Sequence, residues 1–145
     1  MYIQTKYHGE VEIAEDTILS FEKGIPGFPD EKKFTLLSLP DQTFISVLQS
    51  VETSALAFVV ADPYSFYEKY DFKLDENTVE LLDIKGAEDV SAFVILTVQD
   101  PFEASTANLQ APIIVNVKTN NAKQVILNEE NYKTKHPLFG QPAKG

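Results

Sequence analysis

Apolar and polar residues follow one another in short runs along most of the chain, and turn-forming residues separate these runs. β-Branched and aromatic side chains dominate the runs, which is the length and composition typical of β-strands. We predict nine strands, at residues 3–7, 10–13, 17–21, 33–39, 43–49, 56–61, 90–99, 112–118 and 123–128. So many short strands predict an all-β fold, a small antiparallel barrel or roll with one or two short helices.

The predicted strands differ in how apolar their two faces are. Residues 56–60 and 92–96 are apolar at odd and even positions alike, which predicts strands that are buried on both faces. In residues 113–118 apolar side chains alternate with polar ones, so we expect this strand to be exposed on one face. Residues 119–122 follow it and should form a tight hairpin, because asparagine tolerates positive φ.

The middle of the chain has a different pattern. Pro63 stands just after a predicted strand, and proline is well suited to the first residue of a helical turn. Asp75 is placed to cap a short helix that runs to about Asp83 and is ended by Gly86. We expect one or two short helices between residues 63 and 84, with the carboxylates of the second one in water.

The length of 145 residues corresponds to one domain. We predict a single β domain over residues 1–133, followed by an extended, mobile tail over residues 134–145 that is rich in proline and glycine. The chain lacks cysteine, which excludes disulfides and thiolate chemistry. Its N-terminus does not resemble a signal peptide, and its apolar runs are far too short to span a bilayer. We therefore expect a cytoplasmic protein that is a monomer on its own.

Charge is distributed unevenly along the chain. The net charge is −10, and residues 41–103 alone carry 13 of the 22 acidic residues but only three of the 12 lysines. There is no arginine, the residue that best recognises phosphate and guanine. Direct binding to nucleic acid is therefore not expected, whereas an acidic surface attracts basic proteins. Acidity that serves only solubility is the plainer alternative.

Known arrangements of catalytic residues are missing from the sequence. Only two histidines are present, His8 in a turn and His136 beside Pro137, and no serine lies in a nucleophile elbow. The sequence has neither a calcium-loop or zinc motif nor a phosphate-binding loop. Pairs of carboxylates lie among polar residues, where a raised pKa is not expected. We predict that the protein is not an enzyme and has no cofactor or metal.

Two motifs combine glycine, proline or asparagine with strand-like apolar residues. They are Phe-Glu-Lys-Gly-Ile-Pro-Gly-Phe at residues 21–28 and Thr-Ala-Asn-Leu-Gln-Ala-Pro-Ile-Ile-Val-Asn at residues 106–116. Gly24, Pro26 and Gly27 are expected to fix backbone shape. Ile25 and Phe28 are expected either to lie in the core or to form an exposed contact.

These motifs resemble those of the FliW family of flagellar assembly factors. The resemblance also includes residues 5–9, the Asp-Pro-Tyr turn at residues 62–64 and the Gln-Val-Ile-Leu run at residues 124–127, and it extends in order from about residue 2 to residue 133. It implies a β-barrel-like, non-enzymatic regulator in the cytoplasm. It further implies two alternative partners: flagellin, and CsrA, a dimeric RNA-binding repressor of flagellin translation. Flagellin that occupies the protein would free CsrA to repress, and export of flagellin would reverse this.

Nine residues are candidates for contacts with these partners. Charge segregation points to a CsrA-binding region with acidic contacts and two aromatic anchors: Asp71, Glu76, Glu80, Glu103, Tyr70 and Phe102. In the second motif, Thr106, Asn108 and Leu109 are equally suited to present a turn to a partner and to hold that turn together.

Two other functions remain open from the sequence alone. Tyr64, Tyr67 and Tyr70 suggest a stacking platform of a small-ligand or carbohydrate-binding β-domain, which would require a concave aromatic pocket. An enzyme with paired carboxylates ranks third and would require two buried acids with a strongly shifted pKa.

Overall fold

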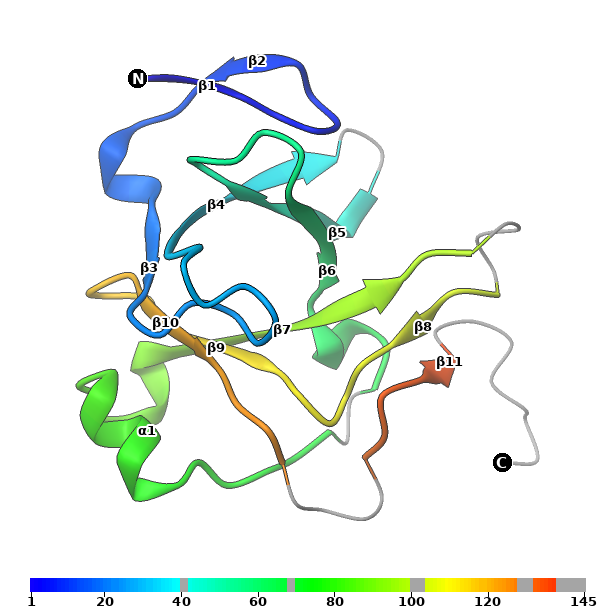
Figure 1. The fold of residues 1–145 in the computed structure, drawn as a ribbon. Coiled ribbons are helices and arrows are strands. Elements are labelled where there is room, and N and C mark those ends of the chain that lie inside the picture. The colour runs from blue at the N-terminus through cyan, green and yellow to red at the C-terminus, as the bar shows by residue number, and fades with distance from the viewer. Residues whose placement is uncertain (40–41, 68–69, 100–103, 128–131, 138–145) are drawn as a thin grey trace.

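Seven strands close into a barrel in the computed structural model, which describes residues 1–39, 42–67, 70–99, 104–127 and 132–137 (Figure 1). Around the ring the strands are β7 (Val90–Thr97), β6 (Ala57–Ala61), β5 (Gln42–Ser50), β4 (Lys33–Leu39), β3 (Leu19–Phe21), β10 (Asn121–Gln124) and β9 (Ile113–Asn116), which pairs again with β7. Neighbours in the ring are antiparallel except β3 and β10, which are parallel. The predicted all-β barrel is confirmed.

Shorter elements decorate this ring. They are the hairpin β1 (Tyr2–Gln4) and β2 (Glu10–Glu12), the edge strands β8 (Thr106–Ala107) and β11 (His136–Pro137), the helix α1 (Glu76–Leu81), and the 3-10 turns η1 (Glu15–Thr17), η2 (Pro63–Ser65) and η3 (Ala87–Asp89). β8 extends the sheet from β7, and β11 pairs with β8. Each of the nine predicted strands overlaps an observed one, and both predicted helical segments are present. The last strand was misplaced, since 123–128 was predicted and β10 covers Asn121–Gln124. β8 and β11 were not predicted from the sequence.

The barrel wall separates two apolar cores. The inner core consists of Leu19, Phe21, Ile25, Phe34, Leu48, Val60, Ile113, Val115 and Ala122. The outer core consists of Ile45, Ala61, Tyr70, Leu82, Val94, Leu96, Ala107, Leu109, Ile114, Val125 and Leu127. Successive residues of a strand point to opposite faces, so the strands between the two cores must be apolar on both faces. This arrangement explains the continuous apolar runs in β6 and β7.

β9 differs from its prediction. All four of its residues are buried, although the alternation at 113–118 predicted one exposed face. Ile113 and Val115 belong to the inner core, and Ile114 belongs to the outer core. Asn116 is the polar residue of the pattern, and it is buried because its side chain binds the backbone after α1 rather than water. The half-exposed strand was therefore a wrong prediction.

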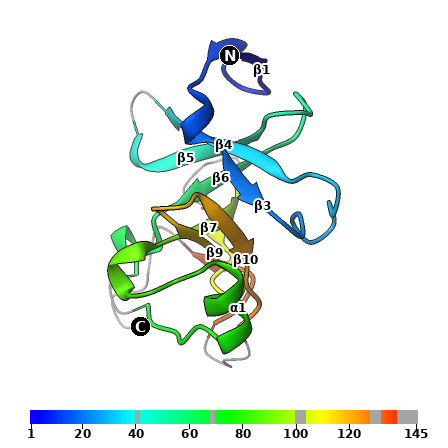
Figure 2. The same cartoon turned by 90° about the vertical axis from the view of Figure 1, so that its left-hand side faces the viewer.

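Helix α1 covers the outer core below the barrel (Figure 2). Asp75 caps it as predicted, because its carboxylate accepts a hydrogen bond from the Thr78 amide at 2.9 Å. Thr78 lowers the pKa of Asp75, first through its side chain and second through this amide hydrogen bond. Thr78 and Leu82 are buried, whereas Glu76 and Glu80 are exposed. None of the helices in the described residues is long and apolar enough to cross a bilayer.

The motif at residues 21–28 forms a shaped loop after β3. Ile25 and Phe28 exchange backbone hydrogen bonds of 3.3 and 2.6 Å, and Gly24 and Gly27 both have positive φ. The Ile25 side chain enters the inner core. Phe28 is 41% exposed and packs edge-on against Phe58. The loop therefore contributes a core residue at Ile25 and an exposed aromatic ring at Phe28.

Candidate protein-binding surface

Exposed carboxylates are concentrated between the end of β6 and the start of β7. We call residues 71–88 the acidic segment. Six of its side chains are exposed carboxylates: Asp71, Asp75, Glu76, Glu80, Asp83 and Glu88. Its only lysines are Lys73 and Lys85, and Lys85 is paired with Asp83 at 3.0 Å. Asp71, Glu76 and Glu80, the described carboxylates of the predicted CsrA-binding region, are therefore exposed to solvent.

Asp89, just after this segment, serves the fold instead. It is 2% exposed, and its Oδ1 lies 2.7 Å from the Lys118 Nζ. Its Oδ2 accepts the amide hydrogens of Lys85 and Gly86. The hydrogen bond from Lys118 is the main cause of its lowered pKa. Asp89 is therefore ionised at neutral pH and holds the loop before β7, which does not suit the role of a proton donor.

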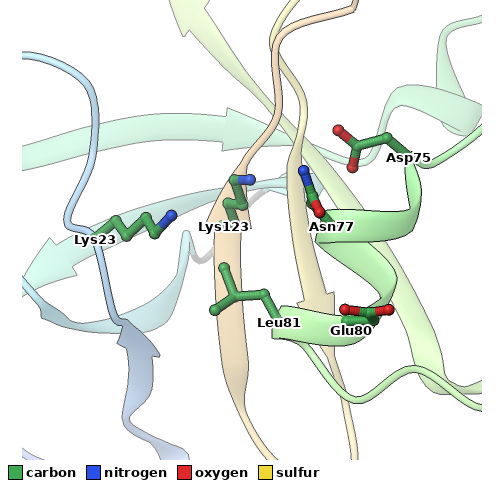
Figure 3. Close-up of a pocket in the computed structure, with 6 residues that line it drawn as sticks. All are labelled: Lys23, Asp75, Asn77, Glu80, Leu81 and Lys123. Atoms are coloured by element: carbon green, nitrogen blue, oxygen red, sulfur yellow. The ribbon is translucent and has the colours of Figure 1, made fainter.

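A polar hollow of about 560 Å³ lies between α1 and the barrel. Figure 3 shows Lys23 and Lys123 on the barrel side and Asp75, Asn77 and Glu80 on the helix side. The two charges of each sign face one another across the hollow, so its electrostatics favour neither anions nor cations. Within the described part of the chain, no three histidine or carboxylate side chains are grouped as metal ligands.

A second, apolar hollow of about 500 Å³ is lined by residues of the acidic segment, η2 and β7. Its lining includes Tyr64, Phe72, Val79, Ile84 and Val90. Tyr64 is 46% exposed, and partial burial together with the carboxylates of Asp71 and Asp62 raises its pKa. The charged residue of the lining is Lys73, and the carboxylates lie beside the hollow at Tyr64. Its apolar walls suit apolar side chains, and the neighbouring carboxylates suit a basic segment.

Tyr70 does not lie on the surface, where an apolar anchor for CsrA was expected. It is only 4% exposed and belongs to the outer core. Its hydroxyl donates a hydrogen bond of 2.6 Å to the Leu109 carbonyl, and its ring packs against Tyr132 at 4.7 Å. Tyr70 therefore joins the acidic segment to the motif at 106–116. A tyrosine whose hydroxyl finds a backbone partner is readily buried, and the sequence alone did not indicate that partner.

Residues 106–109 divide between structural and exposed roles. Leu109 is 2% exposed and lies in the outer core. Asn108 is half-buried, and its Oδ1 accepts hydrogen bonds from the amides of Gln110 and Ala111, both at 3.1 Å. Thr106 is half-buried in β8. The side chains of Asn108 and Leu109 thus hold the turn, while Phe102 and Glu103 lie outside the described residues.

The three tyrosines of the ligand-binding alternative do not form a platform. Tyr64 is exposed, Tyr67 is half-buried and Tyr70 is in the core. The rings of Tyr64 and Tyr70 are tilted by 46° at a centroid separation of 5.9 Å. A stacking platform requires exposed rings that present one plane to a sugar or base, and this arrangement offers only Tyr64.

Residues 132–137 contribute contacts that sequence reasoning missed. Residues 132–137 lie beside β8, and the Lys133 carbonyl accepts the amide hydrogens of both Leu109 and Gln110. Burial and the charge of Lys133 lower the pKa of His136, whose Nε2 accepts the Lys133 amide hydrogen at 2.8 Å. A two-residue strand has no hydrophobic period, so the pattern gave no signal for β11.

Comparisons of sequence and of structure with known proteins point to the same family. A family model described as FliW protein matches residues 2–138. Flagellar assembly factor FliW of Geobacillus kaustophilus is 57% identical over 139 residues, 96% of both chains, and that of Bacillus subtilis is 52% identical over 141 residues, 97% of this chain and 99% of the relative. A crystal structure of the flagellar assembly factor FliW superposes with a TM-score of 0.93 at 54% identity, covering 98% of this chain and 99% of that one. The chain belongs to the FliW family of flagellar assembly factors.

Proposed function

We propose that this protein binds flagellin and, in alternation, CsrA, and that it thereby relieves CsrA repression of flagellin translation in the cytoplasm. The observation that carries the proposal is the exposed acidic segment beside the apolar hollow, on a chain without arginine. Such a surface repels RNA and attracts a basic RNA-binding protein. The role of the FliW family in flagellar assembly supports flagellin as the other partner.

Mass action is a sufficient mechanism for the switch. If the two partners exclude each other, the fraction bound to CsrA falls as free flagellin rises above its Kd. The protein needs no catalytic step and no cofactor for this role. Accumulated flagellin would release CsrA to repress further synthesis, and export of flagellin would return the protein to CsrA.

The first test is a calorimetric titration of the protein with purified CsrA from the same organism, repeated after saturation with flagellin. We expect binding to CsrA that flagellin abolishes. Simultaneous binding of both partners would contradict the alternation, and absence of heat with either folded partner would contradict the partners themselves.

A charge-reversal variant tests the surface. Changing Glu76 and Glu80 to Lys replaces both negative charges with positive ones at exposed positions of α1. We expect weaker CsrA binding and a weaker dependence of its affinity on salt, since fewer opposite charges meet at the interface. The matched control changes Glu12 and Glu15, exposed residues before the barrel, to Lys. Equal losses in both variants would indicate an effect of net charge and contradict the assigned surface.

A further inference from the structure

Residues 132–137, which we call the strap, complete the outer edge of the sheet. His136 and Pro137 pair with Ala107 and Thr106 of β8 in antiparallel register. β11 within the strap is the outermost strand of the sheet at this edge, and β8 lies between it and β7 (Figure 1). Without it, β8 would present unpaired backbone groups, which readily accept an added strand.

The strap is held mainly by backbone contacts and rings on its inner side. Lys133, Thr134, Lys135 and Pro137 are exposed, and none of the strap residues is fully buried. Tyr67 donates a hydrogen bond from its hydroxyl to the Pro137 carbonyl. Segments with few buried apolar contacts and exposed backbone hydrogen bonds open at low free energy. The strap is therefore the kind of element that another chain can replace.

The position of the strap links the two regions singled out in the sequence. The Tyr132 hydroxyl accepts the amide hydrogen of Asp71 at 2.8 Å, and its ring packs edge-on against Tyr70. One residue further, the Lys133 carbonyl binds the amides of Leu109 and Gln110. The strap thus bridges the acidic segment and the turn after β8, and its removal would expose binding groups of both at once.

We propose that the edge of β8 is a strand-addition site, and that the strap occupies it until an extended, lysine-bearing segment of CsrA takes its place. This inference rests on the proposed function. The strap itself indicates what the site accepts. Its Tyr132 packs against Tyr70, and the next residue offers a backbone carbonyl to two amides. The strap also carries lysines and no acidic residue, whereas the protein as a whole is acidic. A basic partner segment with the same features has the matching charge.

A reversible lock tests the proposal in the full chain. Thr106 and Pro137 are opposite each other across β8 and β11. The Asn108 amide donates to the Ile95 carbonyl across the β7–β8 pairing. Residues two apart in a strand point their backbone N–H and C=O groups to the same side, so those of Thr106 also point toward β7. Thr106 and Pro137 therefore form a pair without mutual hydrogen bonds, in which Cα atoms lie about 4.5 Å apart. That separation suits a disulfide, and the chain has no other cysteine to compete.

The variant Thr106→Cys/Pro137→Cys is compared in its reduced and oxidised forms. We expect the reduced form to bind CsrA and the oxidised form to bind it weaker by a factor of about ten or more, because the binding-competent state can no longer be populated. Reduction of the same sample should restore the affinity. Thermal unfolding of both forms establishes that each is folded.

The matched control places the same cross-link in the N-terminal hairpin, with Tyr2→Cys/Glu12→Cys. These exposed residues are opposite each other in β1 and β2. Met1 and Ile13 exchange hydrogen bonds next to them, so they form the same type of pair. Oxidation of this control should leave CsrA affinity unchanged.

The outcomes separate the two proposals. Failure of the reduced strap variant and of the unmodified protein to bind CsrA would overturn the proposed function. Equal binding by reduced and oxidised strap variants would overturn the strand-addition site while leaving the proposed function in place. If the oxidised strap variant lost binding to flagellin alone and kept binding to CsrA, the assignment of the site to a basic segment would be overturned.

Discussion

At Gly24 the backbone leaves no room for a side chain. Its φ is +68°, and a Cβ there would lie 2.5 Å from the Pro29 carbonyl oxygen and 2.6 Å from that of Phe28. Gly27 also has positive φ, at +92°, but no atom lies within 4 Å of the position that a Cβ would occupy there. Gly27 is therefore required only by its backbone conformation, whereas Gly24 is required by both its conformation and the lack of space.

We predict that Gly24→Ala destabilises the protein more than Gly27→Ala does. Gly27→Ala carries only the conformational cost of positive φ, about 1–2 kcal/mol. Gly24→Ala adds a collision with two backbone oxygens, so the loop that places Ile25 in the inner core must shift. Urea unfolding of both variants measures the difference. Equal loss of stability in the two variants would contradict the close approach at Gly24.

At the scale of elements, Asn116 ties α1 to the barrel. Its Nδ2 donates to the carbonyls of Leu82 and Asp83, at 2.7 and 3.2 Å, and its Oδ1 accepts the amides of Lys118 and Thr119. One buried side chain therefore satisfies both the end of the helix and the turn after β9. This connection fixes the helix that carries the exposed carboxylates.

Asn116→Ala is predicted to lower the free energy of unfolding by about 2–4 kcal/mol, because it leaves buried backbone groups without partners. Urea unfolding again provides the measurement. Asn77→Ala is the control, since Asn77 is exposed on the same helix and its replacement should change stability by less than about 0.5 kcal/mol. A small effect at Asn116 would mean that α1 is held by its apolar contacts alone.

The strap is predicted to dock less firmly in mild acid. The groups around His136 are the Lys133 amide and charge and the Tyr67 ring, and the pKa of His136 is lowered in the docked state. Docking is therefore favoured while the ring is neutral, above its ordinary pKa of about 6.5, and weakens as pH falls below that value. A protonated ring also cannot accept the Lys133 amide hydrogen.

Amide hydrogen exchange at Leu109 and Gln110 measures this effect, because both amides bind the Lys133 carbonyl. Protection relative to the intrinsic exchange rate should be lower at pH 5.5 than at pH 7.5. The variant His136→Gln cannot titrate and should show no such difference. The same pH dependence in both proteins would exclude His136 as its origin.

The same elements show how far the sequence predicts this structure. Runs such as 33–39 and 90–97 have the length and composition of strands, so their existence and the barrel class followed from pattern alone. β8 and β11 have two residues each and depend on tertiary pairing, which no local pattern encodes. Asn116 and Tyr70 look like surface residues in the sequence but are buried, because each has hydrogen-bond partners distant in the chain. The motifs identified the family correctly, whereas Tyr70 was wrongly predicted to lie on the surface.

On the scale of the whole molecule, the concentrated negative charge opposes folding by self-repulsion. The net charge is −10, and residues 41–103 account for all of it. We predict that raising NaCl from 0.05 to 0.5 M increases Tm by about 3 °C, because salt screens repulsion between exposed carboxylates. The variant Glu76→Gln/Glu80→Gln should have a smaller increase. A Tm that is unchanged or lower in salt would contradict net repulsion in this surface.

The parallel pairing of β3 with β10 also constrains how the protein is made. Ser20 and Phe21 pair with Asn121 and Ala122, which are synthesised about a hundred residues later. A nascent chain on the ribosome therefore cannot close the barrel while β9 and β10 are still in the exit tunnel. Helix α1 emerges earlier but depends on Asn116 of β9 for its buried contact. A polypeptide stalled before β9 would lack the Asn116 contacts, so the helix that carries the exposed Glu76 and Glu80 would not yet be held against the barrel.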